Sequence, residues 1–257
     1  MPKEPVTPDH RVAVVTGASR GIGKAIAKRL AAPRPDGPAR HVVLVARSEA
    51  PLNDLKAEIE SAGGLATARA VDIGSREAWP AALDEIAGEL GRIDILVNNA
   101  GITRDNLLLR MSDQEWDEVI GVNLTSAFVG MRAVARTMMK HRFGRIVNIA
   151  STTAIVGNSG QANYAAAKSG LIAMTKTVAR ELGGKGVTAN VIAPGFVATD
   201  MTANLPDDVH EMIKKSQAVR RVGEPDDIAA AVAYATSDEA GFFTGQVLTV
   251  DGGLTMA

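Results

Sequence analysis

Short apolar segments rich in β-branched residues alternate along this 257-residue chain with segments of helical periodicity. Strands are predicted over 11–17, 41–48, 65–73, 93–101, 144–151, 186–195 and 245–253, and helices over 23–32, 50–64, 75–91, 112–139 and 160–183, with a last helix from Pro225. Strands that are apolar throughout are typical of parallel sheets buried on both faces. The alternation therefore predicts an α/β fold, with one doubly wound parallel sheet and helices on both faces.

The composition limits the kinds of site that the chain can carry. Apolar residues make up 46% of the chain and the net charge is −1, which gives no general attraction for nucleic acid or anionic lipid. Because there is no cysteine, disulfides and thiolate sites are excluded, and no metal site is expected. Residues 1–10 are polar and proline-rich, so we expect a flexible N-terminus without a signal peptide, a single domain over 11–257, no membrane segment and a cytoplasmic location.

Two segments fall outside the alternation. The segment 32–40 carries three prolines between the first helix and the second strand, and is longer than most such connections. We expect a surface loop insertion there. The segment 196–224 follows a Pro-Gly pair and precedes the last helix, so it is expected to act as a lid.

The stretch "TGASRGIG" (16–23) directly follows the first strand and opens the first helix. Gly17, Gly21 and Gly23 would let the backbone approach a pyrophosphate, while the helix N-terminus supplies free N–H groups. Ser19, Arg20 and Ile22 belong to the same predicted site. A glycine-rich turn alone is a weak signal, but at the first strand-to-helix turn of a parallel sheet it favours a dinucleotide site.

The end of the second strand indicates which dinucleotide binds. A ribose 2′-hydroxyl is usually held by an acidic residue at that place, and here the sequence is Ala46-Arg47. Arg20 in the glycine turn lies on the same side of the predicted sheet. Two guanidiniums without a carboxylate suit a 2′-phosphate, so NADP(H) is the expected cofactor. A solvated surface arginine is the alternative.

Polar residues also follow the third and fourth strands. Asp72 and Ile73 end the third strand, and Asn98, Ala100 and Gly101 stand in the "NNAG" that ends the fourth. Ligands bind outside the carboxyl ends of such strands, so we expect these residues to line the cofactor, with Asp72 accepting from the adenine amino group. Each alone is an ordinary strand-end residue.

The last pattern supplies acid–base chemistry. Ser151 ends the fifth strand, and Tyr164 and Lys168 stand four residues apart in "YAAAK", which places both on one face of a helix. Ser151 would hydrogen-bond a substrate carbonyl and Tyr164 would protonate its oxygen. A tyrosine titrates near pH ~10, and we expect the Lys168 ammonium to lower that pKa.

Together, "TGASRGIG", "NNAG", Ser151 and "YAAAK" occur in the order and at the separations of the short-chain dehydrogenases/reductases, and the chain resembles that family from about Arg11 onward. Such proteins have a Rossmann-type fold. The stretches 98–111, 157–172, 191–202 and 243–253 look most like those of bacterial 3-oxoacyl-[acyl-carrier-protein] reductases.

The resemblance implies further roles. Asn123 would be a fourth catalytic residue that kinks its helix and holds a water of a proton relay; an asparagine bonding its own helix backbone is the alternative. Lys168 would also hold the nicotinamide ribose, and Gln161 would lie near the substrate. The segment lining the nicotinamide carboxamide would include Pro194, Gly195, Val197 and Thr199. Similar enzymes are homotetramers that associate through helices 112–139 and 160–183 and the last strand.

Basic residues are expected to dock an acidic acyl carrier protein near the mouth of the site. By resemblance these are Arg142, Arg145 and Lys185, although Lys185 stands where an arginine is usual and lacks its bidentate fork. That departure leaves room for a coenzyme A thioester.

The predicted function is thus NADPH-dependent reduction of a 3-oxoacyl thioester, carried by acyl carrier protein, in fatty-acid synthesis. The alternatives are an acetoacetyl-CoA reductase or another ketone or polyol oxidoreductase, and a non-catalytic NADP(H)-binding scaffold.

Overall fold

The computed structural model describes residues 10–33, 40–199 and 207–256. The expected flexible N-terminus lies outside these residues except for His10. Residues 34–39 of the expected insertion and 200–206 of the expected lid also lie outside them.

The described part of the chain contains one parallel sheet of seven strands in the order β3-β2-β1-β4-β5-β6-β7. The strands are β1 (Arg11–Thr16), β2 (Arg40–Ala46), β3 (Leu65–Ala70), β4 (Ile95–Asn98), β5 (Gly144–Ile149), β6 (Val187–Pro194) and β7 (Val247–Val250). Each coincides with a predicted strand but is shorter, because the polar and glycine residues that follow the apolar run lie beyond the ladder. The predicted doubly wound α/β fold is confirmed.

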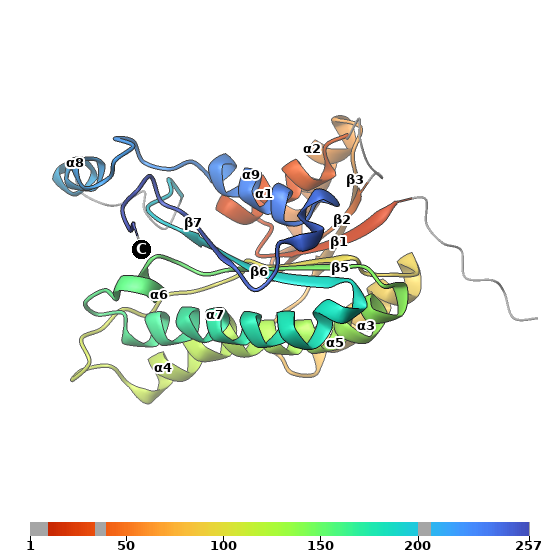
Figure 1. Ribbon diagram of the computed structural model, residues 1–257, viewed down its shortest axis with the longest axis horizontal. Helices are drawn as coiled ribbons and strands as arrows, with labels where there is room; N and C mark the ends of the chain where they lie inside the picture. Colours follow the sequence, from red (N-terminus) through yellow and green to blue (C-terminus); the bar gives the residue numbers. More distant parts are fainter. Residues whose placement is uncertain (1–9, 34–39, 200–206, 257) are drawn as a thin grey trace, which may run out of the picture.

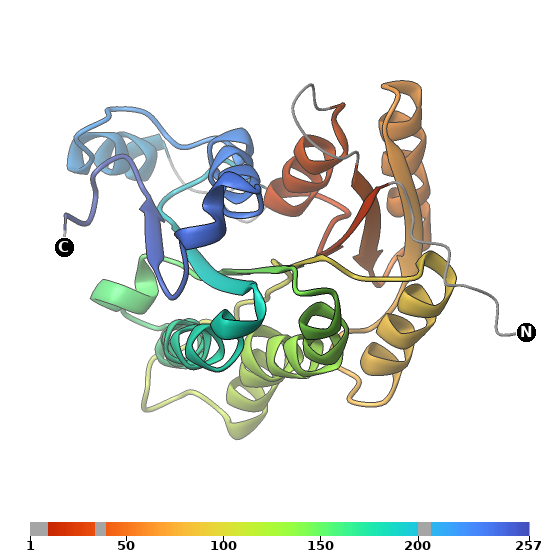
Figure 2. The same cartoon turned by 45° about the vertical axis from the view of Figure 1, so that its right-hand side comes forward.

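Helices cover both faces of the sheet (Figures 1 and 2). They are α1 (Gly21–Ala31), α2 (Glu49–Ser61), α3 (Ala78–Leu90), α4 (Asp113–Ile120), α5 (Ser126–His141), α6 (Thr153–Val156), α7 (Ala162–Leu182), α8 (Asp207–Ser216) and α9 (Pro225–Ala235), with short 3₁₀ segments η2 (Gly183–Lys185) and η3 (Glu239–Phe242). Among the described residues, no helix combines the length and the apolar character needed to cross a bilayer.

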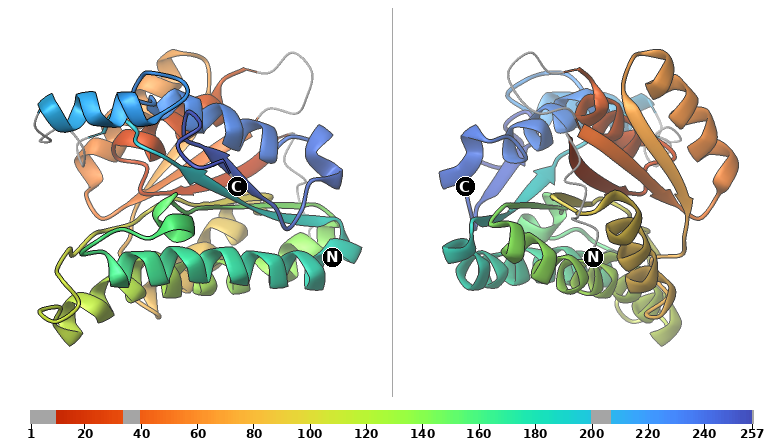
Figure 3. Two further views of the ribbon diagram at one scale, coloured as in Figure 1. Left: turned by 60° about the vertical axis from the view of Figure 1, so that its left-hand side comes forward. Right: turned by 90° about the vertical axis from the view of Figure 1, so that its right-hand side faces the viewer.

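The core is divided by the sheet into two apolar layers. Ala13 and Val15 of β1 face a cluster that includes α1, α2 and α9, whereas Val12 and Val14 face a cluster that includes α3, α5 and α7. The long helices α5 and α7 contact each other along that second face (Figure 3). Since side chains alternate along a strand, this division explains why the consecutive residues 12–15 of β1 are all apolar.

The strand order reverses between β1 and β4, which pair through Ala13–Ile95, Val14–Leu96 and Val15–Val97. In doubly wound sheets a crevice opens at such a reversal, outside the carboxyl ends of the strands. The glycine turn after β1 and the "NNAG" after β4 meet at this place, so the topology brings the two predicted cofactor segments together.

The predicted helix 112–139 is interrupted. Helix α4 begins after a capping box in which Ser112 accepts from the Glu115 N–H and the Glu115 carboxylate accepts from the Ser112 N–H. A π-helical segment, η1 (Gly121–Thr125), separates α4 from α5, and Asn123 is buried within it. Such π segments frequently mark functional sites.

The prediction that Asn98 lines the cofactor is wrong. Asn98 is buried, and its Nδ2 donates to Asn148 Oδ1 at 2.7 Å. Asn148 Nδ2 in turn donates to Thr175 Oγ1 at 2.8 Å. This chain of hydrogen bonds joins β4, β5 and α7 inside the apolar core, where polar groups must be paired. Asn98 therefore fixes α7 relative to the strands.

Replacing Asn148 by Ala should lower the free energy of unfolding by about 2–4 kcal/mol, because it leaves the buried Asn98 and Thr175 groups without their partner. Urea unfolding measures this change. The matched control Asn53→Ala, on the exposed side of α2, should change stability by less than about 0.5 kcal/mol. Equal effects would contradict the assigned role of Asn148.

Candidate active site

Three predicted residues converge at the carboxyl ends of β5 and β6. Ser151 follows β5, while Tyr164 and Lys168 lie in the first two turns of α7, which packs against both strands. Lys168 is buried, and its Nζ donates to the Ile149 carbonyl at 2.7 Å. The Ser151 hydroxyl accepts from the Thr153 N–H at 3.1 Å. It lies near enough to the Tyr164 phenol to lower the pKa of that group. The structure therefore brings the two predicted hydroxyls to the same edge of the sheet.

The expected effect of Lys168 on Tyr164 is not what the structure shows. Burial raises the pKa of the Tyr164 phenol, the Ser151 hydroxyl lowers it in part, and the Asp105 carboxylate raises it further. The Lys168 Nζ lies 5.6 Å from the centre of the phenol ring and is directed to the Ile149 carbonyl. Without cofactor and substrate, the phenol is thus protonated at neutral pH, which is the form that a proton donor needs.

Burial lowers the pKa of Lys168 to about 8. A Cβ atom added at Gly101 would lie 3.2 Å from Asn123 Oδ1 and 3.5 Å from Lys168 Nζ. Gly101, Asn123 and Lys168 therefore surround one small space, which a side chain at position 101 would fill.

Asn123 uses both of its side-chain groups on one neighbour. Its Oδ1 accepts from the Ile102 N–H at 2.8 Å, and its Nδ2 donates to the Ile102 carbonyl at 2.9 Å. The alternative, in which Asn123 bonds the backbone of its own helix, is therefore not what the structure shows. The side chain instead holds the segment that follows β4. Its place in a proton relay stays a prediction.

The glycine turn has the shape of a cradle for a phosphate group. Gly17 and Gly21 have φ angles of +66° and +52°, which side chains other than glycine rarely adopt. A Cβ at Gly23 would lie 2.1 Å from the Gly17 carbonyl oxygen, so α1 begins as close to the turn as glycine allows. Ser19, Arg20 and Ile22 lie in this turn or in the first residues of α1. The residues fit a dinucleotide whose pyrophosphate lies at the N-terminus of α1.

Two residues that the sequence reasoning missed hold this cradle. Thr16 Oγ1 accepts from the N–H groups of Asn99 and Ala100, at 3.0 and 3.1 Å. Asn99 Nδ2 donates to the Thr16 carbonyl at 2.9 Å. The sequence signals for them were the position of Thr16 directly before the first glycine of the turn, and the position of Asn99 as the second Asn of "NNAG".

The adenosine side of the predicted site also lies at this edge. The Ala18 N–H donates to the Val45 carbonyl at 3.2 Å and so joins the glycine turn to the end of β2. Arg20, the N-cap of α1, and Arg47, the first residue after β2, are both exposed there. Asp72 follows β3 with Ile73, and its Oδ1 accepts from the Gly74 N–H at 2.9 Å.

The segment after β6 closes the other side of the crevice. Pro194 ends β6 and its carbonyl accepts from the Thr152 N–H at 3.0 Å, while the Gly195 N–H donates to the Val250 carbonyl at 3.0 Å. Val197 is buried in a bridge with Gly223. Thr199 lies opposite the glycine turn, since its methyl group is 3.4 Å from a Cβ placed at Gly21.

Gln161 lies at the N-terminus of α7, one turn before Tyr164. Its Nε2 donates to Asp105 Oδ2 at 2.9 Å, and its Oε1 accepts from Asn158 Nδ2 at 3.0 Å. Asp105 was missed as a site residue because nothing in its sequence neighbourhood indicates that it reaches α7.

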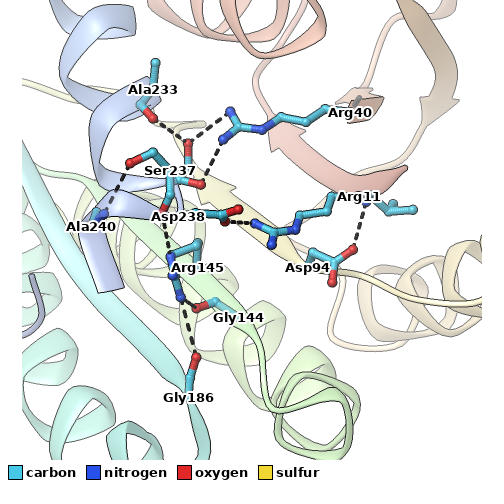
Figure 4. A network of polar contacts seen from close by, with 12 residues as sticks. Arg11, Arg40, Asp94, Gly144, Arg145, Gly186, Ala233, Ser237, Asp238 and Ala240 are labelled. Carbon is cyan, nitrogen blue, oxygen red and sulfur yellow. Dashed lines mark hydrogen bonds and ion pairs between the residues drawn. The ribbon is translucent and has the colours of Figure 1, made fainter. Parts of the chain in front are cut away.

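The predicted docking role of Arg145 is wrong. Arg145 is 5% exposed and donates to the carbonyls of Ser237, Gly144 and Gly186 (Figure 4). Its guanidinium joins the start of β5 to the chain after α9, where Arg11 also pairs with Asp238. An arginine buried in this way holds the fold together and has no surface for a partner.

Arg142 and Lys185 are exposed, but they precede β5 and β6. They therefore lie at the amino edge of the sheet, opposite Ser151 and Tyr164. Arg142 and Lys185 therefore do not form the expected basic patch beside Ser151 and Tyr164 of the same chain.

Comparison with known proteins agrees with the geometry. The model of the family described as "Enoyl-(Acyl carrier protein) reductase" matches residues 17–255. The chain belongs to the short-chain dehydrogenase/reductase family. This family uses a nicotinamide cofactor, which the cradle fits.

Curated relatives match along almost their whole length. The chain is 47% identical to the 3-oxoacyl-[acyl-carrier-protein] reductase of Escherichia coli (strain K12), over 96% of this chain and 98% of the relative. The enzymes of the same name from Haemophilus influenzae and Synechocystis sp. are 45% and 46% identical, over 96% of this chain and 99% and 97% of theirs.

The lowered pKa of Lys168 predicts a pH-dependent stability. The unfolded chain binds a proton at this group up to its ordinary pKa of 10.5, whereas the folded protein releases it near pH 8. Between these values the group adds stability as pH rises, by about 1 kcal/mol per pH unit. Urea unfolding from pH 7.5 to 9.5 should show that the free energy of unfolding of the wild type rises relative to that of Lys168→Met. Parallel curves for the two proteins would contradict the lowered pKa.

Proposed function

We propose that this chain is an NADPH-dependent 3-oxoacyl-[acyl-carrier-protein] reductase that acts in fatty-acid synthesis. The observation that carries the proposal is the pair of hydroxyls, Ser151 and Tyr164, at the sheet edge that also holds the glycine turn. The relatives that bear this name cover 96% of the chain, which supports the same substrate class.

The hydroxyl pair favours a ketone over a carbon–carbon double bond. In ketone reduction the proton goes to an oxygen, to which Ser151 and Tyr164 can both donate hydrogen bonds. In enoyl reduction, the activity named by the family description, the proton goes to carbon, and a second hydroxyl donor on oxygen is not required for it. The site chemistry therefore agrees with the curated relatives.

Each residue then has a chemical task. When bound, the reduced nicotinamide supplies the hydride. Ser151, itself held by the Thr153 N–H, orients and polarises the carbonyl, and Tyr164 gives its proton to the carbonyl oxygen. Lys168, with its pKa near 8, holds its proton less tightly than an ordinary lysine and returns one to the phenolate. Asn123 keeps the chain after β4 beside Lys168.

The preference for NADPH is proposed from charge. Arg20 and Arg47 are both exposed at the edge where the adenosine ribose would lie, and the sequence places no carboxylate directly after β2. A 2′-phosphate would accept from these guanidiniums, whereas a 2′-hydroxyl would find no acidic partner.

Association into a homotetramer is part of the proposal. Beside α5 and α7 lies a hollow of about 430 Å³ lined by Leu124, Phe128, Gly170 and Met174 among others. Phe128 is 46% exposed beside this hollow and Trp116 of α4 is 40% exposed, and burying these side chains would favour helix pairing with a second copy.

Acetoacetyl-CoA reduction is the second candidate. It is favoured by the placement of Arg142 and Lys185 at the opposite edge of the sheet, which leaves the expected carrier-docking patch unformed at this site. The ratio of kcat/KM for acetoacetyl groups on carrier protein and on coenzyme A distinguishes the two: a ratio above one favours the carrier, and a ratio below one favours coenzyme A.

Tyr164→Phe should lower kcat by about 10²-fold or more, because one placed proton donor typically contributes 10²–10⁴ in rate. NADPH oxidation with acetoacetyl thioesters measures the rate, and fluorescence titration should show NADPH still bound. A variant with near-normal turnover would exclude Tyr164 as the acid.

Arg47→Asp should weaken NADPH binding and favour NADH, because it places a carboxylate where the 2′-phosphate is proposed to lie. The ratio of kcat/KM for the two cofactors should fall by about 10-fold or more, as expected for a lost charge-assisted contact. Arg110→Asp, which changes an exposed arginine outside the adenosine edge, is the matched control. An unchanged ratio in Arg47→Asp would refute the phosphate role.

A further inference from the structure

A second buried asparagine stands directly before Tyr164. Asn163 lies in the first turn of α7 and is fully buried. Its Nδ2 donates to the Arg104 carbonyl at 2.9 Å and to the Glu115 carbonyl at 3.2 Å. Its Oδ1 accepts from the Tyr164 N–H at 2.7 Å. Both ends of this amide are therefore bonded to the main chain, in the segment after β4, in α4 and in α7.

The N-terminus of α7 lacks the usual side-chain cap. Gln161 is the N-cap residue, but its side chain makes no capping hydrogen bond and pairs with Asp105 and Asn158 instead. The first N–H groups of a helix have no partner within it, and the N-cap side chain usually accepts from the second or third of them. Here the third N–H group, that of Tyr164, donates to Asn163. One side chain thus fixes the start of α7 and the main chain of the proposed proton donor.

The same side chain fixes the segment after β4 against α7. Asn123 of η1 holds this segment at Ile102, through both ends of its amide. Asn163 holds it two residues later, at the Arg104 carbonyl. The contact with the Glu115 carbonyl adds α4, which packs against α7 (Figure 1). Two buried asparagines, one in η1 and one in α7, therefore set the path of the segment that leaves β4.

Hydrogen bonds hold α7 on both sides of Tyr164. One turn later, Lys168 donates to the Ile149 carbonyl at the end of β5. Directly before Tyr164, Asn163 bonds the segment after β4 and α4. Because the ends of helices fray, the contact of Lys168 alone would leave the first turn of α7 free to move relative to Ser151.

We propose that Asn163 is a positioning residue for the reduction: it fixes the first turn of α7 to the segment after β4 and so holds Tyr164 where its proton reaches the carbonyl oxygen. The proton transfer rests on the proposed function, whereas the fixing of the helix turn is a property of the protein alone. A contact that only stabilised the fold would change the free energy of unfolding and leave the turnover of the folded protein unchanged.

Hydrogen exchange measures the fixing of the turn without substrate or cofactor. The chain contains two tyrosines, Tyr164 and Tyr234, so isotope-labelled tyrosine gives two amide signals in NMR spectra, which Tyr234→Phe assigns. In Asn163→Ala the Tyr164 N–H loses its acceptor and should exchange about 10-fold faster or more. The Tyr234 N–H, in α9, is the internal control and should keep its rate. An unchanged rate at Tyr164 would overturn the inference.

Kinetics test the positioning itself. Asn163→Ala should lower kcat for ketone reduction by about 10-fold or more in protein that still binds NADPH, because a small displacement of a reacting group costs rate. KM for the thioester should change less than kcat. The matched control is Asn148→Ala, which also frees α7 from a buried hydrogen bond, but at Thr175, about three turns beyond Tyr164. It should lose stability and keep its kcat. An equal fall of kcat in both variants, or no fall in Asn163→Ala, would contradict the positioning role.

Asn163→Asp is the second variant, for the case that Asn163→Ala does not fold. It keeps the size of the side chain and an acceptor for the Tyr164 N–H. It removes the amide donors to the carbonyls of Arg104 and Glu115. Exchange at Tyr164 should therefore stay close to that of the wild type, while kcat falls. A wild-type kcat in this variant would show that the contacts with the segment after β4 and with α4 do not position the phenol.

Tyr164→Phe separates this inference from the proposed function. If Tyr164→Phe is inactive and Asn163→Ala keeps a normal kcat, the positioning role alone is overturned. If Tyr164→Phe also turns over normally, the assignment of the proton donor has failed, and the positioning role fails with it.

Discussion

A buried ammonium on a backbone carbonyl organises the site. Lys168 donates to the carbonyl of Ile149, the last residue of β5, and this contact joins α7 to the strand at the point where the chain turns away. Ser151 follows two residues later on the strand side, and Tyr164 lies one turn earlier on the helix. This contact therefore holds the turn of α7 that carries Tyr164 beside the strand end that carries Ser151. Burial of the ammonium opposes this arrangement, which is why the pKa of Lys168 falls to about 8.

The parallel sheet determines what else can reach those hydroxyls. The carboxyl ends of β1 and β4 bring the glycine turn and the Thr16–Asn99 contacts to one side, and the segment after β6 brings Thr199 to the other. The opposite edge carries Arg11, Arg40 and Arg145, which pair with the end of α9 and its following residues (Figure 4). One edge of the sheet is thus available for ligands, while the other is used for holding the last helix in place.

The strands and helices were predictable because each depends on a local pattern: an apolar run, a helical period, a cap or a glycine. The errors concern side chains whose partners are far away in the sequence. Asn98 was predicted to face a ligand because it ends a strand, and its partner Asn148 lies fifty residues away in the sequence. Arg145 was predicted to be a surface cation because its partner, the Ser237 carbonyl, lies ninety-two residues away in the sequence. The pKa of Tyr164 was predicted to be lowered by Lys168, but it is raised. The i and i+4 spacing predicts that the two side chains are close and not where the ammonium points, which here depends on the Ile149 carbonyl.

The central claim is that the two hydroxyls serve the oxygen of a ketone. The most direct measurement offers the protein, with NADPH, an equimolar mixture of acetoacetyl and crotonyl thioesters on one carrier, and identifies the products by mass spectrometry. Our account predicts that 3-hydroxybutyryl thioester forms and that the crotonyl thioester is recovered unchanged. Formation of butyryl thioester from the crotonyl substrate, with acetoacetyl thioester left over, would contradict it.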